Sequence, residues 1–176
     1  MSSDNWDELH DEAEPIERYQ QGLYYPIYVG ELLNQRYRVE HKLGHGGFST
    51  VWLAYDLQRK RDVALKIMIP GDAGEVEYHI QTEIIQTVPD ISNLLTYEAT
   101  FTLRGSQGDH RVLVLPLRGP NLRSHLRQAS VASRMTVAGQ LLKAFANLHK
   151  CQIVHRGGCL CLFIFSLRFR MNSSAC

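Results

Sequence analysis

The feature that most constrains the fold of this chain is a glycine-rich turn followed by a lysine within an apolar strand. The turn reads "LGHGGFSTVWLA", and the lysine, Lys66, ends the run "VALK". Gly44 and Gly46 let the backbone approach a bulky anion and adopt dihedral angles that side chains forbid. Successive backbone N–H groups in such a turn can point at phosphate oxygens. The pattern therefore predicts a phosphate-binding turn next to a strand lysine.

Lys66 needs anionic partners, because an ammonium group inside an apolar strand is costly without them. Phosphates and a carboxylate would satisfy it. Glu83 lies seventeen residues later on a predicted helix. Glu77 lies only eleven residues later, which leaves little chain for the strand to end and the helix to begin. We therefore expect Glu83 to pair with Lys66. The alternative is an ordinary hairpin whose lysine extends its ammonium group to solvent.

Hydrophobic periodicity predicts five strands and one helix, with more helices to follow. We expect strands around Tyr37 and Val39, in "STVWLAYD" and "RDVALKIMI", and in "LLTYEATFTLRG" and "HRVLVLPL". A helix is predicted over residues 75–87, where Val76, Ile80, Ile84 and Ile85 recur at helical spacing.

Beyond Pro120 the pattern becomes helical. Leu122 and Leu126 mark a short helix. A longer helix carries one apolar stripe, formed by Val137, Leu141, Leu142, Phe145 and Leu148. The expected fold class is α+β.

Charge is strongly segregated along the 176 residues, although the formal net charge is only +1. Residues 1–21 carry seven acids and one base, which predicts an acidic, mobile tail. Residues 22–109 carry eleven acids and eight bases, a net charge of −3. Residues 110–176 carry ten bases and no Asp or Glu. The region after Asp109 can therefore supply no carboxylate to a functional site.

The sequence favours an intracellular setting, in the cytoplasm or the nucleus. The first twenty residues are acidic and polar, unlike a secretory signal. The longest apolar stretch, residues 159–165, is far shorter than the roughly 20 residues that cross a bilayer, so no membrane association is expected. All four cysteines lie in the last quarter, and we expect them to be reduced rather than paired in disulfides.

"LGHGGFSTVWLAYD" and "DVALKI" together resemble the amino-terminal lobe of eukaryotic protein kinases. The run "YYPIYVGELLNQRYRVEHKLGHGGFSTVWLA" is similar to the SR-protein kinase group, particularly to its fungal members, and "RVLVLPLRGPNL" is similar to that group's fifth strand and hinge. Ser49 stands where the general pattern has a third glycine, as is usual in this group. The resemblance extends from about Tyr24 to Arg156.

The resemblance implies a kinase-like amino-terminal lobe over residues 22–117, with a five-stranded antiparallel sheet and one helix. An incomplete, helical carboxy-terminal lobe with two helices would follow over residues 118–156. Residues 157–176 have no kinase counterpart, so the kinase sequence is expected to be truncated there.

The resemblance also implies an ATP site. Gly44 to Val51 would cover the nucleotide, Lys66 would hold its α- and β-phosphates, and Glu83 would orient Lys66. Adenine would lie against apolar side chains beside a gatekeeper leucine and a hinge whose Pro116 carbonyl accepts and whose Arg118 N–H donates a hydrogen bond. The full implied set is Leu43, Gly44, His45, Gly46, Gly47, Phe48, Ser49, Thr50, Val51, Ala64, Lys66, Glu83, Leu115, Pro116 and Arg118.

The segment "NLHKCQIVHR" resembles the end of the large kinase helix and the first two residues of the catalytic loop. The family pattern continues with an aspartate that accepts the substrate proton and, five residues later, an asparagine that holds a metal. Gly157 and Leu162 occupy these two places. His155 is structural in the family, and Ser166 offers only a neutral hydroxyl. Mg²⁺ prefers carboxylate, phosphate and water ligands, so we expect neither a complete catalytic set nor metal ligands.

The tail over residues 157–176 is rich in Phe, Ile and Leu, which favours association rather than catalysis. A zinc site formed by His155, Cys159 and Cys161 is disfavoured, because the cysteine spacing is unusual and no fourth ligand is evident. An appended tail, for example from read-through into non-coding sequence, is the simpler interpretation. With no full carboxy-terminal lobe to cover the stripe of the long helix, poor solubility or chaperone binding is expected.

Three functions are compatible with the sequence. The first is a serine/threonine protein kinase of which this chain is a truncated, catalytically incompetent form. The second is a non-catalytic, nucleotide-binding pseudokinase or scaffold that engages protein partners. The third is a nucleic-acid binder, suggested by the basic half, but dispersed arginines more often form a solvated face. The expected partners are ATP and proteins, and Mg²⁺ is expected for the family although its ligands are absent here.

Overall fold

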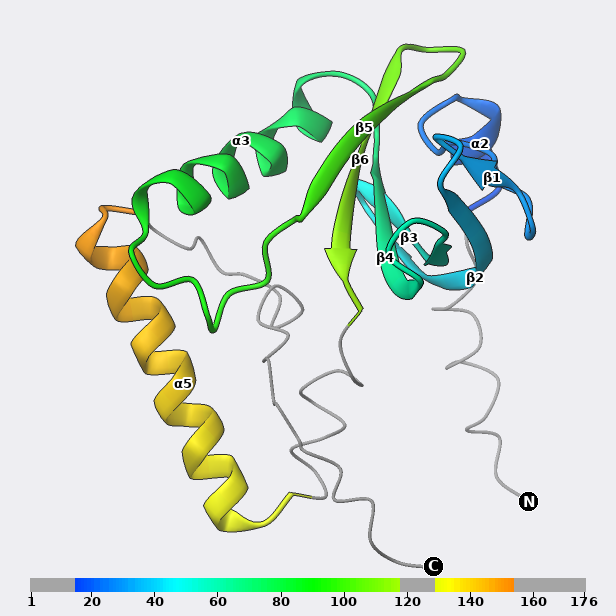
Figure 1. The fold of residues 1–176 in the computed structure, drawn as a ribbon. Coiled ribbons are helices and arrows are strands. Elements are labelled where there is room, and N and C mark those ends of the chain that lie inside the picture. The colour runs from blue at the N-terminus through cyan, green and yellow to red at the C-terminus, as the bar shows by residue number, and fades with distance from the viewer. Residues whose placement is uncertain (1–14, 118–128, 154–176) are drawn as a thin grey trace, which may run out of the picture. The chain divides into compact units, whose positions relative to one another are not determined.

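The computed structural model describes residues 15–117 and 129–153 (Figure 1). Its sheet has six strands in the order β1-β2-β3-β4-β6-β5. The strands are β1 (Leu32–Leu33), β2 (Tyr37–Gly46), β3 (Ser49–Asp56), β4 (Arg61–Met68), β5 (Ala99–Arg104) and β6 (Asp109–Pro116). The pairs β1–β2, β2–β3, β3–β4 and β5–β6 are antiparallel.

The five predicted strands are confirmed, and β1 is an addition. Its two residues pair with the start of β2, with Leu33 opposite Tyr37. Asn34 and Gln35 between them have φ angles of 48° and 53°, in the left-handed region that tight hairpin turns use. A two-residue strand is too short to show alternation, which explains why periodicity does not predict it.

The core of the sheet consists of side chains that are at most 7 % exposed. They come from β1 to β4 and from β6: Leu33, Tyr37, Val39, Trp52, Ala54, Val63, Leu65, Ile67, Val112 and Val114. Phe101 of β5 stacks on the ring of Tyr37, with 5.5 Å between the ring centroids. The core therefore joins β1 and β2 to β5 and β6, which lie much later in the sequence.

A buried ion pair fixes the start of β2 against the end of β3. Asp56 accepts two hydrogen bonds from the Arg36 guanidinium, at 2.7 and 2.8 Å, and its side chain is 1 % exposed. The backbone N–H groups of Gln58 and Arg59 donate to the same carboxylate. The Arg36 hydrogen bond is the main cause that lowers the pKa of Asp56 to about 2.

A buried histidine joins β6 to β4. His110 Nδ1 lies 2.9 Å from the carbonyl oxygen of Met68, and the ring of Tyr25 meets the imidazole edge-on. Burial lowers the pKa of His110. A side chain at Gly105 would collide with this imidazole, because a Cβ there would lie 2.6 Å from it. His110 is therefore a packed structural residue.

Helix α3 spans Asp72–Thr87, three residues longer at its start than predicted. Gly71, with a φ of 83°, turns the chain sharply after β4, which allows the helix to begin four residues after Met68. Gly74 is required within the helix, because a Cβ there would lie 1.9 Å from the carbonyl oxygen of Ile69. This close approach holds the first turn of α3 against the end of the preceding strand.

The described chain forms two compact units. The first contains the sheet and the start of α3, up to Tyr78, and returns at Glu98–Leu115. The second contains His79–Tyr97 and the chain from Pro116 onwards, including helix α5 (Val131–Lys150). Ser130 caps α5, because its Oγ accepts a hydrogen bond from the Ser133 N–H.

Helix α5 confirms the predicted long helix, but part of its apolar stripe is covered, contrary to expectation. Val137, Ala144 and Leu148 are buried, and Leu94, Leu141 and Phe145 pack beside them. The expectation that the stripe stays uncovered is therefore wrong at Val137 and Leu148, whereas Leu142 is 70 % exposed. Leu142 follows Leu141 by one residue, and a rotation of about 100° per residue places the two on different sides of the helix.

The predicted mobile tail does not extend to residue 21. Glu17–Gln20 form the short helix α2, which Figure 1 shows beside β1. Tyr24, which follows it, is 2 % exposed. The average acidity of residues 1–21 obscures the contacts of its last residues, such as the hydrogen bond that the Tyr19 hydroxyl accepts from Lys42. The predicted short helix around Leu122 and Leu126 lies outside the described residues, as does the predicted tail over residues 157–176.

Candidate nucleotide-binding site

The predicted glycine-rich turn is the hairpin between β2 and β3. Gly46 pairs with Ser49, which leaves Gly47 and Phe48 at the tip. A Cβ at Gly44, Gly46 or Gly47 would meet no atom within 4 Å, so the space beside these residues is open. None of the three has a φ in the left-handed region, so the prediction of dihedral angles forbidden to side chains is wrong. Glycine here keeps the backbone accessible to a bulky ligand.

The rest of the turn is anchored in the sheet. Ile69 donates its backbone N–H to the carbonyl oxygen of Phe48 at 3.0 Å, while the Phe48 ring is 63 % exposed. Ser49 and Thr50 are buried, and Thr50 Oγ1 accepts from the Trp52 indole at 3.2 Å. His45 is exposed. The turn therefore has an exposed tip on a rigid base.

Lys66 lies on β4 directly opposite Val51 of β3, and Ala64 lies opposite Leu53. Cross-strand partners share a face of a sheet, so Val51, Ala64 and Lys66 lie on one face. Ala64 is 9 % exposed, and Leu115, the predicted gatekeeper on β6, is 6 % exposed. This face carries the predicted phosphate-binding lysine beside apolar side chains.

The Lys66 ammonium pairs with the carboxylate of Glu77, with distances of 2.8 and 2.6 Å to the two oxygens. The two side chains are 20 % and 21 % exposed, so the pair is largely shielded from water. The expectation that Glu83 fills this role is wrong. Because α3 begins at Asp72, the eleven residues after Lys66 suffice to place Glu77 within its second turn. Glu83 is exposed, six residues further along the same helix.

A second set of contacts holds the first two turns of α3. Arg111 of β6 donates through Nε to both carboxylate oxygens of Glu75, at 2.8 and 3.0 Å. Its guanidinium lies over the ring of Tyr78, 4.3 Å from the centroid. Glu75 and Tyr78 flank Glu77, so these contacts fix the rotation of α3 that directs Glu77 at Lys66.

Other predicted site residues differ in how fully the structure describes them. Leu43 is 46 % exposed and Val51 is half-buried. Pro116 is the last residue of β6. Arg118 lies outside the described residues, and so do His155, Gly157, Cys159, Cys161 and Leu162. The predictions for the catalytic loop and against a zinc site therefore stay predictions. Within the described ranges, no cluster of three His, Cys, Asp or Glu side chains could hold a metal ion.

Sequence reasoning missed two side chains that contact the tip of the glycine turn. Tyr24 donates its hydroxyl to the carbonyl oxygen of Gly46 at 2.6 Å, and Arg18 donates to that of Gly47 at 2.5 Å. One signal was available, because Arg18 is the single base among residues 1–21 and is followed by Tyr19, Tyr24 and Tyr25. This concentration of aromatic residues is unusual for a mobile tail.

The arrangement of glycine turn, strand lysine and helix glutamate coincides with a family assignment. The protein kinase domain family matches residues 37–157, which include all three. The chain belongs to the protein kinase family. The solved kinase domain of PF14_0431 supports the same fold, with a TM-score of 0.58 at 22 % identity over 73 % of this chain and 39 % of that one.

Curated kinases resemble the chain across most of its length. Protein kinase dsk1 of Schizosaccharomyces pombe is 38 % identical over 159 residues, which are 81 % of this chain and 29 % of the relative. Human SRSF protein kinase 3 is 32 % identical over 82 % of this chain and 28 % of its own length. The kinase SRPK of Physarum polycephalum is 33 % identical over 87 % of this chain and 39 % of its own length.

These relatives confirm the similarity to SR-protein kinases. The chain spans less than a third of the length of the first curated relatives that it matches. Within the described ranges, no helix combines the length and the apolar character needed to cross a membrane.

Proposed function

We propose that this kinase-family chain binds ATP through the glycine turn and Lys66 but does not transfer phosphate by itself. The main observation in favour of ATP binding is the ion pair between Lys66 of β4 and Glu77 of α3, next to an open glycine turn. Glu77 holds the Lys66 ammonium in place, which suits that ammonium to bind the α- and β-phosphates. The open space beside Gly44, Gly46 and Gly47 suits the approach of a phosphate to backbone N–H groups.

The adenine end of the site has support from burial and from the family. Ala64 and Leu115 present apolar side chains on buried strands, and Val51 lies on the same face as Lys66. Leu43 is partly exposed just before the glycine turn, where it can pack against a flat ring. In this proposal Pro116 and Arg118 supply the hinge hydrogen bonds, as the family pattern implies.

The proposal that the chain does not transfer phosphate depends on which side chains could accept the substrate proton or bind Mg²⁺. Phosphoryl transfer in kinases uses an aspartate for the substrate proton, and further oxygen ligands hold Mg²⁺. Gly157 and Leu162 bring no side-chain oxygen to these places, and no Asp or Glu follows Asp109. The residues of this region therefore do not fit the Mg²⁺ that kinases use.

Calorimetric titration of the full chain with ATP, with and without Mg²⁺, tests the binding half. We expect saturable binding that changes little with Mg²⁺ and weakens at least about tenfold in Lys66→Met, because a charge-assisted contact to phosphate is lost. Lys150→Met is the matched control, because Lys150 is exposed in the last turn of α5. Equal affinity of the Lys66→Met variant and the wild type contradicts the proposal.

A second candidate is transfer of the ATP γ-phosphate to protein Ser or Thr, as in the serine/threonine kinases among the relatives. The names of several relatives as SRSF protein kinases favour an Arg/Ser-rich substrate for that activity. Transfer to such a peptide above background, abolished in Lys66→Met, would favour this candidate over the first. Binding to protein partners as a scaffold remains compatible with either one.

A further inference from the structure

The tip of the glycine turn accepts two hydrogen bonds from the segment over residues 18–24, which we call the N-terminal clamp. The Tyr24 hydroxyl donates to the Gly46 carbonyl oxygen at 2.6 Å, and an Arg18 guanidinium N–H donates to that of Gly47 at 2.5 Å. These contacts join positions 22 and 29 residues apart in the sequence. They hold the two glycines whose backbone would border a bound phosphate.

The two donors of the clamp are fixed relative to each other before they reach the turn. The backbone N–H groups of Leu23 and Tyr24 both donate to the carbonyl oxygen of Arg18, at 2.9 and 3.1 Å. The Arg18 guanidinium lies 5.4 Å from the centroid of the Tyr24 ring, and the Tyr19 ring meets Tyr24 edge-on. Because these side chains are already ordered, little further entropy is lost when they bind the turn.

The clamp is also fixed to the rest of the sheet unit. Lys42 of β2 donates to the Tyr19 hydroxyl at 2.9 Å, and its ammonium lies over the rings of Tyr19 and Trp52. Gly22, with a φ of 69°, lies so close to the β5–β6 hairpin that a Cβ would be 2.5 Å from Gln107 Cγ. The clamp therefore connects the glycine turn to a hairpin about 60 residues further along the sequence.

Holding the two carbonyl oxygens also sets the direction of the next two N–H groups. All described peptide bonds are trans, and in a trans peptide the C=O and the following N–H point in opposite directions. With the Gly46 and Gly47 oxygens directed at the clamp, the N–H groups of Gly47 and Phe48 point away from it. Backbone N–H groups at such a turn are the donors that bind phosphate oxygens.

We propose that Arg18 and Tyr24 are positioning residues of the nucleotide site, which hold the glycine turn so that the Gly47 and Phe48 N–H groups face the phosphates of a nucleoside triphosphate. This role rests on the proposed ATP binding. It also predicts a selective effect. Because the turn would contact phosphates, loss of a clamp hydrogen bond should weaken ATP binding but leave the binding of a nucleoside without phosphates almost unchanged.

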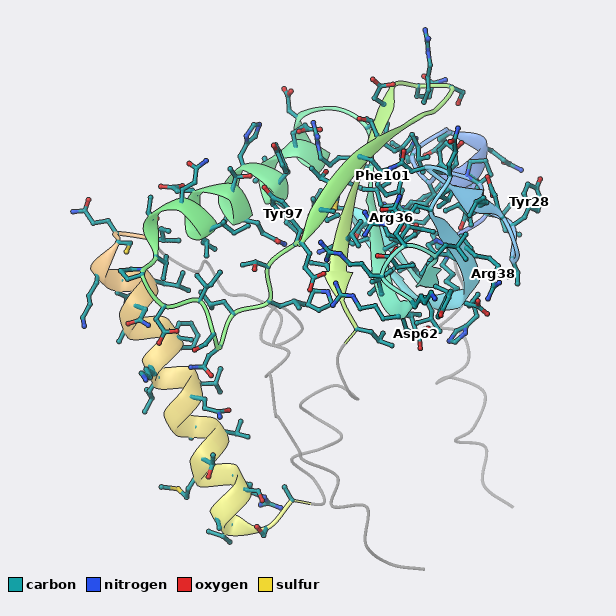
Figure 2. The ribbon with its side chains drawn as sticks, in the orientation of Figure 1. Tyr28, Arg36, Arg38, Asp62, Tyr97 and Phe101 are labelled. Atoms are coloured by element: carbon teal, nitrogen blue, oxygen red, sulfur yellow. The ribbon has the colours of Figure 1, made fainter. Side chains whose placement is uncertain are left out.

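The test compares ATP with adenosine on the full chain. Calorimetric titrations of Tyr24→Phe and Arg18→Ala are expected to show ATP affinity lowered about fivefold, because one hydrogen bond is lost in each variant. Adenosine affinity should change less than about twofold. Tyr28→Phe is the control, because Tyr28 is 75 % exposed and lies away from the ribbon in Figure 2. Unchanged ATP affinity in both clamp variants, or equal losses for ATP and adenosine, overturns the proposal.

Hydrogen–deuterium exchange of residues 44–50 without nucleotide separates this proposal from the function on which it rests. If the clamp holds the turn, exchange there is faster in Tyr24→Phe than in Tyr28→Phe or wild type. If the wild type binds no ATP, the proposed function fails, and with it the phosphate-directing role. Wild-type exchange in Tyr24→Phe refutes the clamp itself, whatever the nucleotide affinity.

Discussion

Among the described residues, the sheet unit and the helical unit bury different amounts of apolar side chain. In the sheet unit, ten residues at most 7 % exposed form one cluster across five strands. In the helical unit, the cluster on α5 contains two buried residues, Val137 and Ala144, with three partly buried neighbours. Met135 and Leu142 on the same helix are 69 % and 70 % exposed. Within the described chain, the sheet unit therefore contains its own core, whereas α5 leaves apolar side chains exposed.

The two units also differ in chemistry. The sheet unit provides acidic partners for its cations, as in Lys66–Glu77, Arg36–Asp56 and Arg111–Glu75. The helical unit includes Asp90, which accepts from Ser92 and lies 4.0 Å from Lys143, but the sequence beyond Asp109 contains no carboxylate. The acidic side chains therefore all lie at or before Asp109, so residues 110–176 contribute no Asp or Glu to catalysis.

The largest expected effect is on the free energy of unfolding when the sheet core is truncated. Leu65 is fully buried, so Leu65→Ala should lower this free energy by about 3 kcal/mol. Leu142→Ala, a matched change at an exposed leucine, should change it by less than about 0.5 kcal/mol. Urea denaturation followed by tryptophan fluorescence measures both. Similar losses in the two variants would contradict this difference in burial between the two units.

The next effect is a dependence of stability on pH that comes from Asp56. Its folded pKa of about 2 lies below the usual value of 3.8, so its stabilisation is fully present above pH 3.8 and is lost as the pH falls through 2. The contribution is about 2 kcal/mol. Asp56→Asn should therefore be less stable than wild type at pH 7, and this difference should shrink between pH 4 and pH 2. A difference that is constant with pH would show that the ion pair with Arg36 is not its cause.

A smaller effect distinguishes the two glutamates of α3. Glu77→Gln should weaken ATP binding about tenfold, because Lys66 loses the carboxylate that orients it. Glu83→Gln is the matched control on the same helix, where the side chain is exposed, and it should bind ATP like wild type. The measurement is the calorimetric affinity of the two variants. The reverse ranking would restore Glu83 as the partner of Lys66.

The smallest effect concerns the start of α5. Ser130→Ala removes the side-chain acceptor for the Ser133 N–H, 3.1 Å away, and should cost about 1 kcal/mol of local helix stability. Hydrogen exchange of the first turn of α5 should accelerate, while the exchange of β3 and β4 stays unchanged. Acceleration in the strands as well would indicate that the two units unfold together, and would weaken the distinction between them.

The strands that position the site were predictable because their apolar residues alternate and their ends coincide with turn residues. Lys66 was also predictable, since a lysine in such a strand requires an anionic partner. The identity of its anionic partner was not predictable from the sequence. The short separation of eleven residues disfavours Glu77, but a left-handed φ at Gly71 and close packing at Gly74 shorten the path from strand to helix.

The N-terminal clamp was not predictable from composition. Residues 1–21 are acidic on average, and this average conceals Arg18 and Tyr19, whose partners Gly47 and Lys42 lie in the β2–β3 hairpin further along the chain. The burial of Val137 and Leu148 on α5 was also mispredicted, because periodicity locates an apolar stripe but not the residues that pack against it. Both errors concern tertiary contacts that local sequence does not encode.

The most direct measurement combines ATP binding and phosphoryl transfer on one preparation of the full chain. The chain is incubated with labelled ATP, Mg²⁺ and an Arg/Ser-rich peptide, and peptide phosphorylation is compared with that of Lys66→Met prepared in the same way. The predicted result is saturable ATP binding by wild type, with peptide phosphorylation no higher than in the variant. Phosphorylation well above that of Lys66→Met would contradict the claim that the region after Asp109 lacks what transfer requires.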